Sequence, residues 1–222
     1  MEQVDPKRAY SLEEAAETLA KFPKTQFDES VELSFRLAVD PRQSDQMVRG
    51  TVALPHGSGK AVKVVVFAKP GAAADAAKEA GAEHVGFEEL IQKVQGGWTD
   101  FDVAVATPEA MSEVRKLGRI LGPRGLMPNP KTGTVTDDTA KAVKEVKAGR
   151  VEYKVDKTAN LHVPVGRRSF SPEHLVENAR AVIDTVVKAR PQSVRGTFIK
   201  NCVMAATMSP SVRLDPNEYQ KA

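Results

Sequence analysis

The sequence predicts an α+β domain built from both ends of the chain, with an α/β domain inserted between them. Three observations support this fold class: strict apolar–polar alternation at residues 31–39, a nearly continuous apolar run at 62–68, and renewed alternation after Gly149. Alternation is typical of half-buried strands in antiparallel sheets, whereas a continuous apolar run indicates a strand buried on both faces. We therefore expect two kinds of sheet in one chain.

The predicted domain boundaries follow these changes of pattern. Domain I, a discontinuous α+β domain with an antiparallel sheet and helices, takes residues 1–58 and 150–222. Domain II, a Rossmann-like α/β domain, takes residues 59–149. The crossings near 57–60 and 149–150 carry glycines and are expected to act as hinges. Three small domains in a row is a weaker alternative, because the two strands expected before residue 58 are too few to bury a core.

The predicted elements of domain I begin with a helix from Ser11 to about Phe22, where Ser11 and Glu14 form a capping box. "VELSFRLAV" is a strand, "DPRQSD" a turn and "MVRGTVALP" the returning strand. After Gly149, "RVEYKVD" and "NLHVPVG" are strands joined by "KTAN", a candidate hairpin turn. A capped helix then runs from Ser171 to about Ala189, and "GTFIKNCVMAATM" is the last strand.

Domain II is expected to alternate strands and helices, which implies a mainly parallel sheet. Thr107, Pro108 and Glu109 have the residue types of an N-cap, a first-turn proline and a first-turn acid. Strands are expected at 62–68, 84–86 and 101–106, and helices at 72–80, 87–94, 107–121 and 138–148.

Composition excludes several classes of protein. The chain has 222 residues, 41% of them hydrophobic, and no window resembles a membrane span of roughly 18 apolar residues. The polar N-terminus is unlike a signal peptide, and the single cysteine, Cys202, rules out an internal disulfide, so we expect a cytoplasmic protein without a membrane partner.

The net charge of +3 is mild but unevenly distributed. Residues 1–58 carry −3, residues 59–149 carry +1 and residues 150–222 carry +5. The basic excess of the C-terminal part is compatible with a polyanionic partner and equally with an ordinary solvated surface.

The sequence contains no complete motif for catalysis, cofactor binding or metal binding. "GSGK" at Gly57–Lys60 fails as a phosphate-binding loop, because Leu54 stands where a glycine is needed and a strand rather than a helix follows. Pro130 excludes the same motif at Lys131. The four histidines have no metal-pair spacing. We therefore expect no enzyme, no cofactor and no metal site.

With these motifs excluded, recognition of a partner such as RNA is the remaining class of function. Cations are interspersed with small hydrogen-bonding side chains in the second antiparallel part, a pattern that suits phosphate and 2′-hydroxyl contacts on folded RNA and also fits an ordinary solvated face. Taken without any relative, Phe27 is more simply a core residue, and Met208 fits either an RNA contact or the core. This pattern comprises Lys154, Lys157, Thr158, Asn160, His162, Arg167 and Arg168, and Arg36 stands on the polar face of the first strand. Together with the residues that the resemblance described below assigns, the candidate RNA-binding residues are Phe27, Ser30, Arg36, Lys157, Thr158, His162, Arg167, Arg168, Thr207, Met208 and Ser209.

The stretch "KLGRILGPRGLMPNPKTGTV" resembles the signature of the bacterial ribosomal protein L-one family. "DPRQSDQMVRGTVALPHGSGK", "GGWTDFDVAVATPEAM", "KAGRVEYKVDKTANLHVPVG" and "TMSPSVRLDP" also resemble family blocks, in family order. The resemblance covers the chain from about Ser11 to Pro216.

The resemblance implies an RNA-binding constituent of the large ribosomal subunit. It implies binding to the mobile rRNA stalk beside the tRNA exit site, assistance in the release of deacylated tRNA, repression of the protein's own operon mRNA, and a monomer within the ribosome. Alternatives are a free translational repressor and, less well supported, a nucleotide-binding α/β enzyme.

The resemblance also assigns residues. Phe27 matches the aromatic RNA contact of the family, and Thr207 and Met208 match the first two residues of its Thr-Met-Gly triad. Ser209 stands in place of the third residue, glycine. Because glycine permits close backbone approach and positive φ, a serine at this position is expected to cost some of both. Arg36, Lys157 and Thr158 match family positions, whereas Gln26 stands where some relatives carry lysine.

The loop at 118–136 has an open role. Its prolines stiffen it and its glycines permit tight reversals. Arg119, Arg124 and Lys131 are expected either to touch stalk RNA or to face the other domain.

Overall fold

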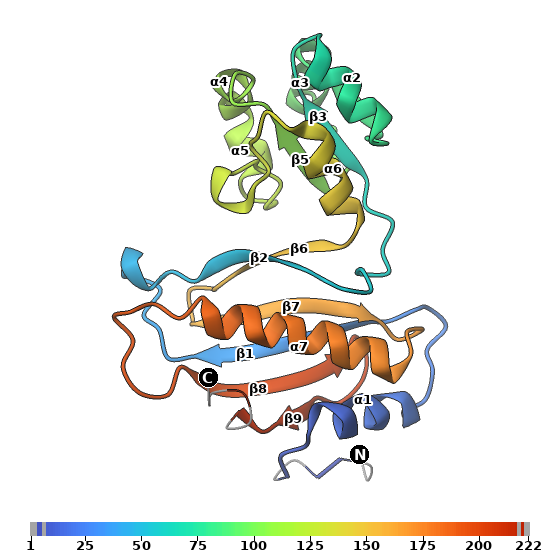
Figure 1. Cartoon of the computed structure of the whole chain (residues 1–222), viewed down its shortest axis with the longest axis vertical. Coiled ribbons are helices and arrows are strands. Elements are labelled where there is room, and N and C mark those ends of the chain that lie inside the picture. Colours follow the sequence, from blue (N-terminus) through green and yellow to red (C-terminus); the bar gives the residue numbers. More distant parts are fainter. Residues whose placement is uncertain (1–3, 6–7, 217–218, 220–222) are drawn as a thin grey trace. The chain divides into compact units, whose positions relative to one another are not determined.

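The structure, a computed structural model, describes residues 4–5, 8–216 and 219, except the side chain of Lys131. It divides into two compact units. Unit 1 comprises Met1–Gly59 and Gly149–Ala222, and unit 2 comprises Lys60–Ala148. Figure 1 labels the helices and, except for β4, the strands of the two units.

Unit 1 contains a four-stranded sheet in the order β7-β1-β8-β9, with every neighbouring pair antiparallel. A separate antiparallel pair, β2 and β6, forms a second sheet. The elements are α1 (Leu12–Lys21), β1 (Ser30–Leu37), the 3₁₀ turn η1 (Ser44–Gln46), β2 (Arg49–Ala53), β6 (Arg150–Lys154), β7 (Asn160–Arg167), α7 (Pro172–Lys188), β8 (Ile199–Ala206) and β9 (Val212–Leu214).

Both helices of unit 1 begin where their caps predict. Ser11 Oγ accepts the Glu14 N–H (3.2 Å) and the Glu14 carboxylate accepts the Ser11 N–H (3.3 Å), which completes the predicted capping box. Ser171 Oγ accepts the His174 N–H at the start of α7. These bonds satisfy backbone donors that a helix start leaves unpaired.

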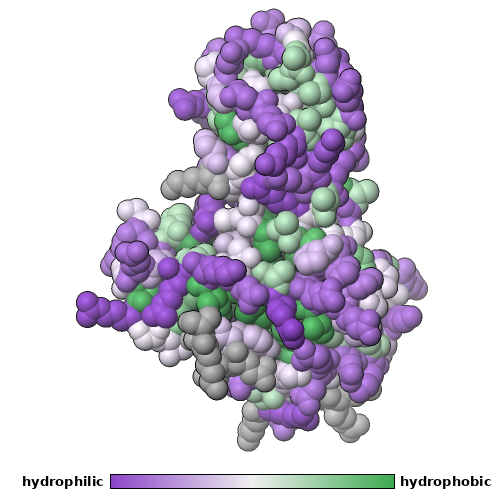
Figure 2. Space-filling model, viewed as in Figure 1, coloured by the Kyte–Doolittle hydropathy of each residue, from purple (hydrophilic) through white to green (hydrophobic). Residues whose placement is uncertain are grey.

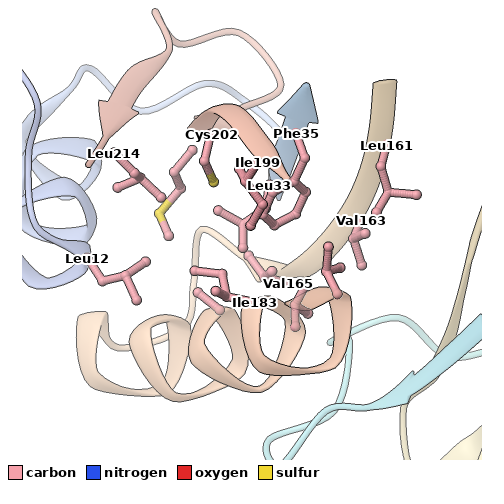
Figure 3. Close-up of a cluster of buried hydrophobic side chains, with 14 of the residues drawn as sticks. Leu12, Leu33, Phe35, Leu161, Val163, Val165, Ile183, Ile199, Cys202 and Leu214 are labelled. Carbon is pink, nitrogen blue, oxygen red and sulfur yellow. The ribbon is translucent and has the colours of Figure 1, made fainter. Parts of the chain in front are cut away.

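The core of unit 1 lies between the sheet and the two helices. Alternate residues of β1, β7 and β8 point inward, and they meet Leu12 of α1 and Ile183 of α7 in one cluster of buried side chains (Figure 3). Because strand side chains alternate between faces, this packing leaves the polar residues of the same strands on the outer face.

Unit 2 contains a parallel sheet in the order β4-β3-β5, with helices packed against it. The central strand is fully buried along its length, as its apolar run predicts. The elements are β3 (Val64–Phe67), α2 (Ala72–Glu79), β4 (His84–Gly86), α3 (Glu88–Gln95), β5 (Val103–Ala106), α4 (Met111–Val114), η2 (Arg115–Leu117), α5 (Gly118–Leu121), η3 (Pro130–Thr132) and α6 (Thr139–Lys147).

Two strand pairings differ from the prediction. The expected return of β2 along β1 is wrong, because β7 and β8 occupy both edges of β1 and β2 pairs with β6. The "KTAN" turn does form, with Ala159 at φ 65° and the Asp156 N–H bonded to the Asn160 carbonyl (2.8 Å). However, the strands on either side of it enter different sheets, so it does not close a hairpin.

The helix expected at 107–121 is broken into α4, η2 and α5. It starts later than expected, at Met111, although Thr107 Oγ1 accepts the Ala110 N–H at 3.4 Å. Gly118 within the segment lowers its helix propensity, which is consistent with a helix that does not continue in one piece. The short strand β9 was not predicted.

No helix among the described residues has the length and apolar character that a membrane crossing needs. On the side drawn in Figure 2, hydrophilic residues cover much of the surface of each unit.

Gly149 is a position where unit 1 requires glycine. Its φ is +102°, and a Cβ there would overlap Gly57 Cα and lie 2.9 Å from the Ser58 nitrogen. We expect Gly149→Ala to lower the free energy of unfolding by about 2 kcal/mol, measured by urea titration with circular dichroism. Gly196→Ala, at φ +76° with nothing within 4 Å, is the control and should cost about 1 kcal/mol. Equal losses for the two variants would contradict a packing role for Gly149.

Candidate RNA-binding surface

The outer face of the four-stranded sheet carries most of the predicted RNA-binding residues. β1 turns Ser30, Ser34 and Arg36 outward, and the register places them opposite residues of β7 and β8. We call this region the outer sheet face. It comprises Ser30, Glu32, Ser34, Arg36, Asn160, His162, Pro164, Arg167, Asn201, Val203 and Ala205, with Phe27, Thr207 and Met208 at one end and Lys157 and Thr158 at the other.

At the Arg36 end, the guanidinium is held by the turn that precedes β7. Arg36 Nη1 donates to the Thr158 carbonyl (2.5 Å) and to Asn160 Oδ1 (3.1 Å). Asp156 in turn accepts the Thr158 N–H and hydroxyl (both 2.8 Å). Lys157 is exposed beside them. The arrangement holds the Arg36 guanidinium in place and leaves the Lys157 side chain exposed, and both cations suit contacts with phosphate oxygens.

Hydrogen bonds hold the pKa of Asp156 below its ordinary value. Desolvation raises this pKa, but the N–H groups of Asn160 and Thr158 and the Thr158 hydroxyl together outweigh desolvation and lower it. The charged carboxylate is therefore the form that stabilises the turn.

The sign of this shift predicts a pH dependence of stability. A folded-state pKa below the ordinary 3.8 contributes stability that is present above 3.8 and is lost as the pH falls through the lower folded value. We expect Asp156→Asn to cost about 1 kcal/mol at pH 7, with the difference from wild type shrinking as the pH is lowered below the ordinary value. Urea titrations across this range measure it, and Asp184→Asn, at an exposed position of α7, controls for the lost charge. A difference that persists unchanged in acid would point to another cause.

The middle of the outer sheet face is joined across strands by a polar pair. Ser34 Oγ and His162 Nδ1 lie 2.9 Å apart, which leaves the other ring nitrogen of the exposed His162 available to a partner. Asn201, which the sequence analysis missed, is in register with Arg36. Its Oδ1 is buried and has no hydrogen-bond partner among the described residues. A lone asparagine in a strand gives no sequence signal for such a position.

At the opposite end, Ser30, Arg167 and Thr207 come together. The Ser30 N–H donates to Thr207 Oγ1 (3.2 Å), and Arg167 Nη1 donates to Ser30 Oγ (3.0 Å). Met208 follows and is 70% exposed, so the alternative of a core methionine is wrong. This end combines the hydrogen-bonded polar groups of Ser30, Arg167 and Thr207 with the exposed apolar side chain of Met208.

Ser209 fits its turn without the conformational freedom of glycine. Among the described residues Ala159 is the only non-glycine with positive φ, so the expected backbone cost of a serine at 209 does not arise. Ser209 Oγ accepts the Ala206 N–H (2.9 Å) and donates to the Pro210 carbonyl (3.0 Å). The hydroxyl therefore closes the turn that presents Met208.

Phe27 lies on the surface. Its side chain is 55% exposed and does not join the core of unit 1, so the interpretation of Phe27 as a core residue is wrong. It borders a recess of about 320 Å³ that is also lined by Lys24, Thr25, Asp28, Arg168 and Ser169. An exposed ring beside a cation and small polar groups is a suitable platform for stacking on a base or a ribose.

Arg168, in contrast, is not presented to a partner. Its side chain is 9% exposed and pairs with Glu29, which is 1% exposed (3.3 Å). The guanidinium also donates to the carbonyls of Leu19, Phe22 and Pro23 at the end of α1. The prediction that Arg168 binds RNA is therefore corrected: these acceptors occupy its guanidinium, and it holds α1 to the turn after β7.

The basic residues of the loop at 118–136 belong to unit 2, not to the outer sheet face. Arg119 on α5 and Arg124 are both exposed, and Arg124 donates to Thr99 Oγ1. The side chain of Lys131 lies outside the described part of the structure. Within the part that is described, no three His, Cys, Asp or Glu residues form a group that could hold a metal ion.

Comparison with known proteins places the chain in a family. Residues 19–210 match the model of the family described as Ribosomal protein L1p/L10e family. A protein of Persephonella marina, named Large ribosomal subunit protein uL1, is 59% identical over 97% of this chain and 90% of its own length. A protein of the same name from Lactobacillus delbrueckii subsp. bulgaricus is 53% identical over 96% of this chain and 92% of its own length. The chain therefore belongs to the ribosomal protein L1p/L10e family.

Proposed function

We propose that this chain is a constituent of the large ribosomal subunit and binds the mobile stalk of its ribosomal RNA through the outer sheet face. The relatives carry the name of a large-subunit protein. Because the family is one of structural ribosomal proteins, this chain acts by binding and not as an enzyme. Its expected place is the cytoplasmic ribosome, where it acts as a single copy.

One observation carries the proposal. Phe27 and Met208, two large apolar side chains that are 55% and 70% exposed, stand at the end of a face whose other members are mostly polar and include the cations Arg36, Lys157 and Arg167. Exposed apolar groups next to fixed hydrogen-bonding groups suit a partner with both flat bases and a polar backbone. RNA has this combination.

The charge of the outer sheet face implies a moderate dependence on salt. Arg36, Arg167 and Lys157 contribute cations, while Glu32 is exposed in the same face. Each phosphate contact contributes roughly 0.7–0.9 to the slope of log K against log salt. We expect a slope that corresponds to fewer than about ten released ions, and a steeper one would contradict this mode of binding.

Footprinting on large-subunit rRNA tests the proposal directly. The purified chain, titrated in the presence of excess unrelated RNA, should protect one compact element from hydroxyl radicals. Protection spread evenly along the RNA, or none, would contradict specific binding. Sedimentation with large subunits distinguishes a ribosomal constituent from a free repressor.

We also propose a role in the release of deacylated tRNA, with unit 2 moving relative to unit 1. Gly57 and Gly149 are packed together inside unit 1, and Asn178 bonds to His56 and Gly57 (both 3.0 Å). Bending is therefore expected beyond these residues rather than at the two glycines. A disulfide engineered between a residue of unit 1 and a residue of unit 2 should block this bending and slow tRNA release from the ribosome, and an unchanged rate would exclude the hinge from the mechanism.

Repression of the protein's own operon mRNA would use the same surface. An mRNA leader that folds like the stalk element would then compete with it for the outer sheet face. Competition between the two RNAs for the purified chain tests this, and simultaneous binding of both would contradict a shared site.

A further inference from the structure

The loop between α1 and β1 presents Phe27, yet residues 22–29 form no helix or strand. The support for this loop comes from the turn that follows β7. Asp28 Oδ1 accepts the Ser169 N–H (3.1 Å), and Asp28 Oδ2 accepts the Ser169 hydroxyl (2.8 Å). The carboxylate of the residue next to Phe27 is thus bonded twice to a single partner.

The main chain around Asp28 is fixed in the same way. Arg167 Nη1 donates to the Asp28 carbonyl (3.1 Å), and the Arg168 N–H donates to the Glu29 carbonyl (2.8 Å). Within the loop, Thr25 Oγ1 donates to the Phe27 carbonyl (2.8 Å). The backbone is therefore held at Phe27 and at the two residues after it, although the ring itself is exposed.

We propose that Asp28 is a positioning residue for RNA binding: its two bonds to Ser169 fix the loop so that the Phe27 ring is already in place when RNA arrives. A loop that is ordered in advance does not lose that conformational entropy on binding. This inference rests on the proposed function, because it assumes that Phe27 contacts RNA.

The sign of the charge makes the proposal testable. Asp28 is an anion beside a surface that would receive a polyanion, so removing its charge alone should strengthen binding or leave it unchanged. Removing its hydrogen bonds should weaken binding. The two effects oppose each other, and a pair of variants separates them.

Asp28→Ala removes both the charge and the bonds, whereas Asp28→Asn removes the charge but keeps an acceptor for the Ser169 N–H and a donor for its oxygen. We expect the affinity for the rRNA element to fall roughly threefold to tenfold for Asp28→Ala and not to fall for Asp28→Asn, with the urea midpoint of both close to wild type. Loss of affinity in both variants would mean that the Asp28 carboxylate itself contacts RNA. Unchanged or tighter binding by Asp28→Ala would overturn the proposal.

A double-mutant cycle shows whether Asp28 acts through Phe27. If it does, Asp28→Ala should weaken RNA binding in the wild-type background but not in a Phe27→Ala background. Equal losses of affinity in the two backgrounds would overturn the positioning role of Asp28. They would not contradict the proposal that the chain binds rRNA. Wild-type chain that protects no rRNA element would instead contradict the proposed function together with this inference, so the two failures are distinguishable.

Discussion

Phe27→Ala is expected to lower the affinity for the rRNA element roughly 10- to 100-fold while leaving the stability of the fold nearly unchanged. The ring is 55% exposed and outside the core, so its removal creates no cavity. Stacking of an aromatic side chain on a base contributes about 1–3 kcal/mol, a range that includes this change because each 1.4 kcal/mol is about tenfold in affinity. Filter binding measures the affinity, and urea titration measures the stability.

Met47→Ala is the matched control for this variant. Met47 is also a large exposed apolar residue (46%), but it lies between η1 and β2 and is not among the residues of the outer sheet face. It should therefore change RNA affinity little. A loss of stability for Phe27→Ala without a selective loss of RNA binding would show that the ring supports the fold instead.

Arg168→Ala is expected to destabilise unit 1 by about 3–5 kcal/mol. The substitution leaves Glu29, which is 1% exposed, without its cation, and an uncompensated buried charge is costly. It also removes the donors to the carbonyls of Leu19 and Phe22 at the end of α1. Both effects weaken the contacts that hold the end of α1 to the turn after β7.

The single tryptophan allows the two units to be followed separately. Trp98 lies in unit 2, so its fluorescence reports the unfolding of that unit, while circular dichroism reports both. Arg168→Ala should shift the circular dichroism transition and leave the Trp98 transition in place. Arg180→Ala removes an exposed ion pair with Glu13 and should cost less than about 1 kcal/mol. Similar costs for the two arginines would contradict the buried role of Arg168.

Local signals in the sequence predicted the helices of unit 1 well. The capping box at Ser11 and the cap at Ser171 both form, because they depend on residues only three positions apart. The alternation in β1 and β7 and the continuous apolar run in β3 also match the observed burial. Each of these patterns reports the surroundings of its own segment.

The pairing of strands was harder to predict. β2 follows β1 in the chain and β7 follows β6, so proximity favoured two hairpins, but β2 pairs with β6 across the inserted segment. Which strand occupies an edge depends on all the strands that compete for it. Alternation predicts which face of a strand is buried but not the neighbour that it acquires.

The candidate site shows the same limit. The sequence alone favoured Phe27 as a core residue and Arg168 as an RNA contact, and in the structure the ring is exposed and the guanidinium is nearly buried. Only the resemblance to relatives assigned Phe27 to RNA. The hydrophobicity and charge of a residue predict its average burial. The burial of these two side chains is instead set by the turn at 167–169, which contains Arg168 and is hydrogen-bonded to the loop that carries Phe27.

By itself the sequence determined where the two helices of unit 1 start, which strand faces are buried and which family the chain resembles, because these depend on short patterns or on shared blocks of residues. Only the tertiary structure decided that Asp28, Arg167, Arg168 and Ser169 form one joint, and that the ends of β1 and β8 meet at Ser30 and Thr207. Asp28 lies 139 positions from Arg167 and Ser30 lies 177 positions from Thr207, and only the packing of the sheet against α1 and α7 brings each pair within hydrogen-bonding distance.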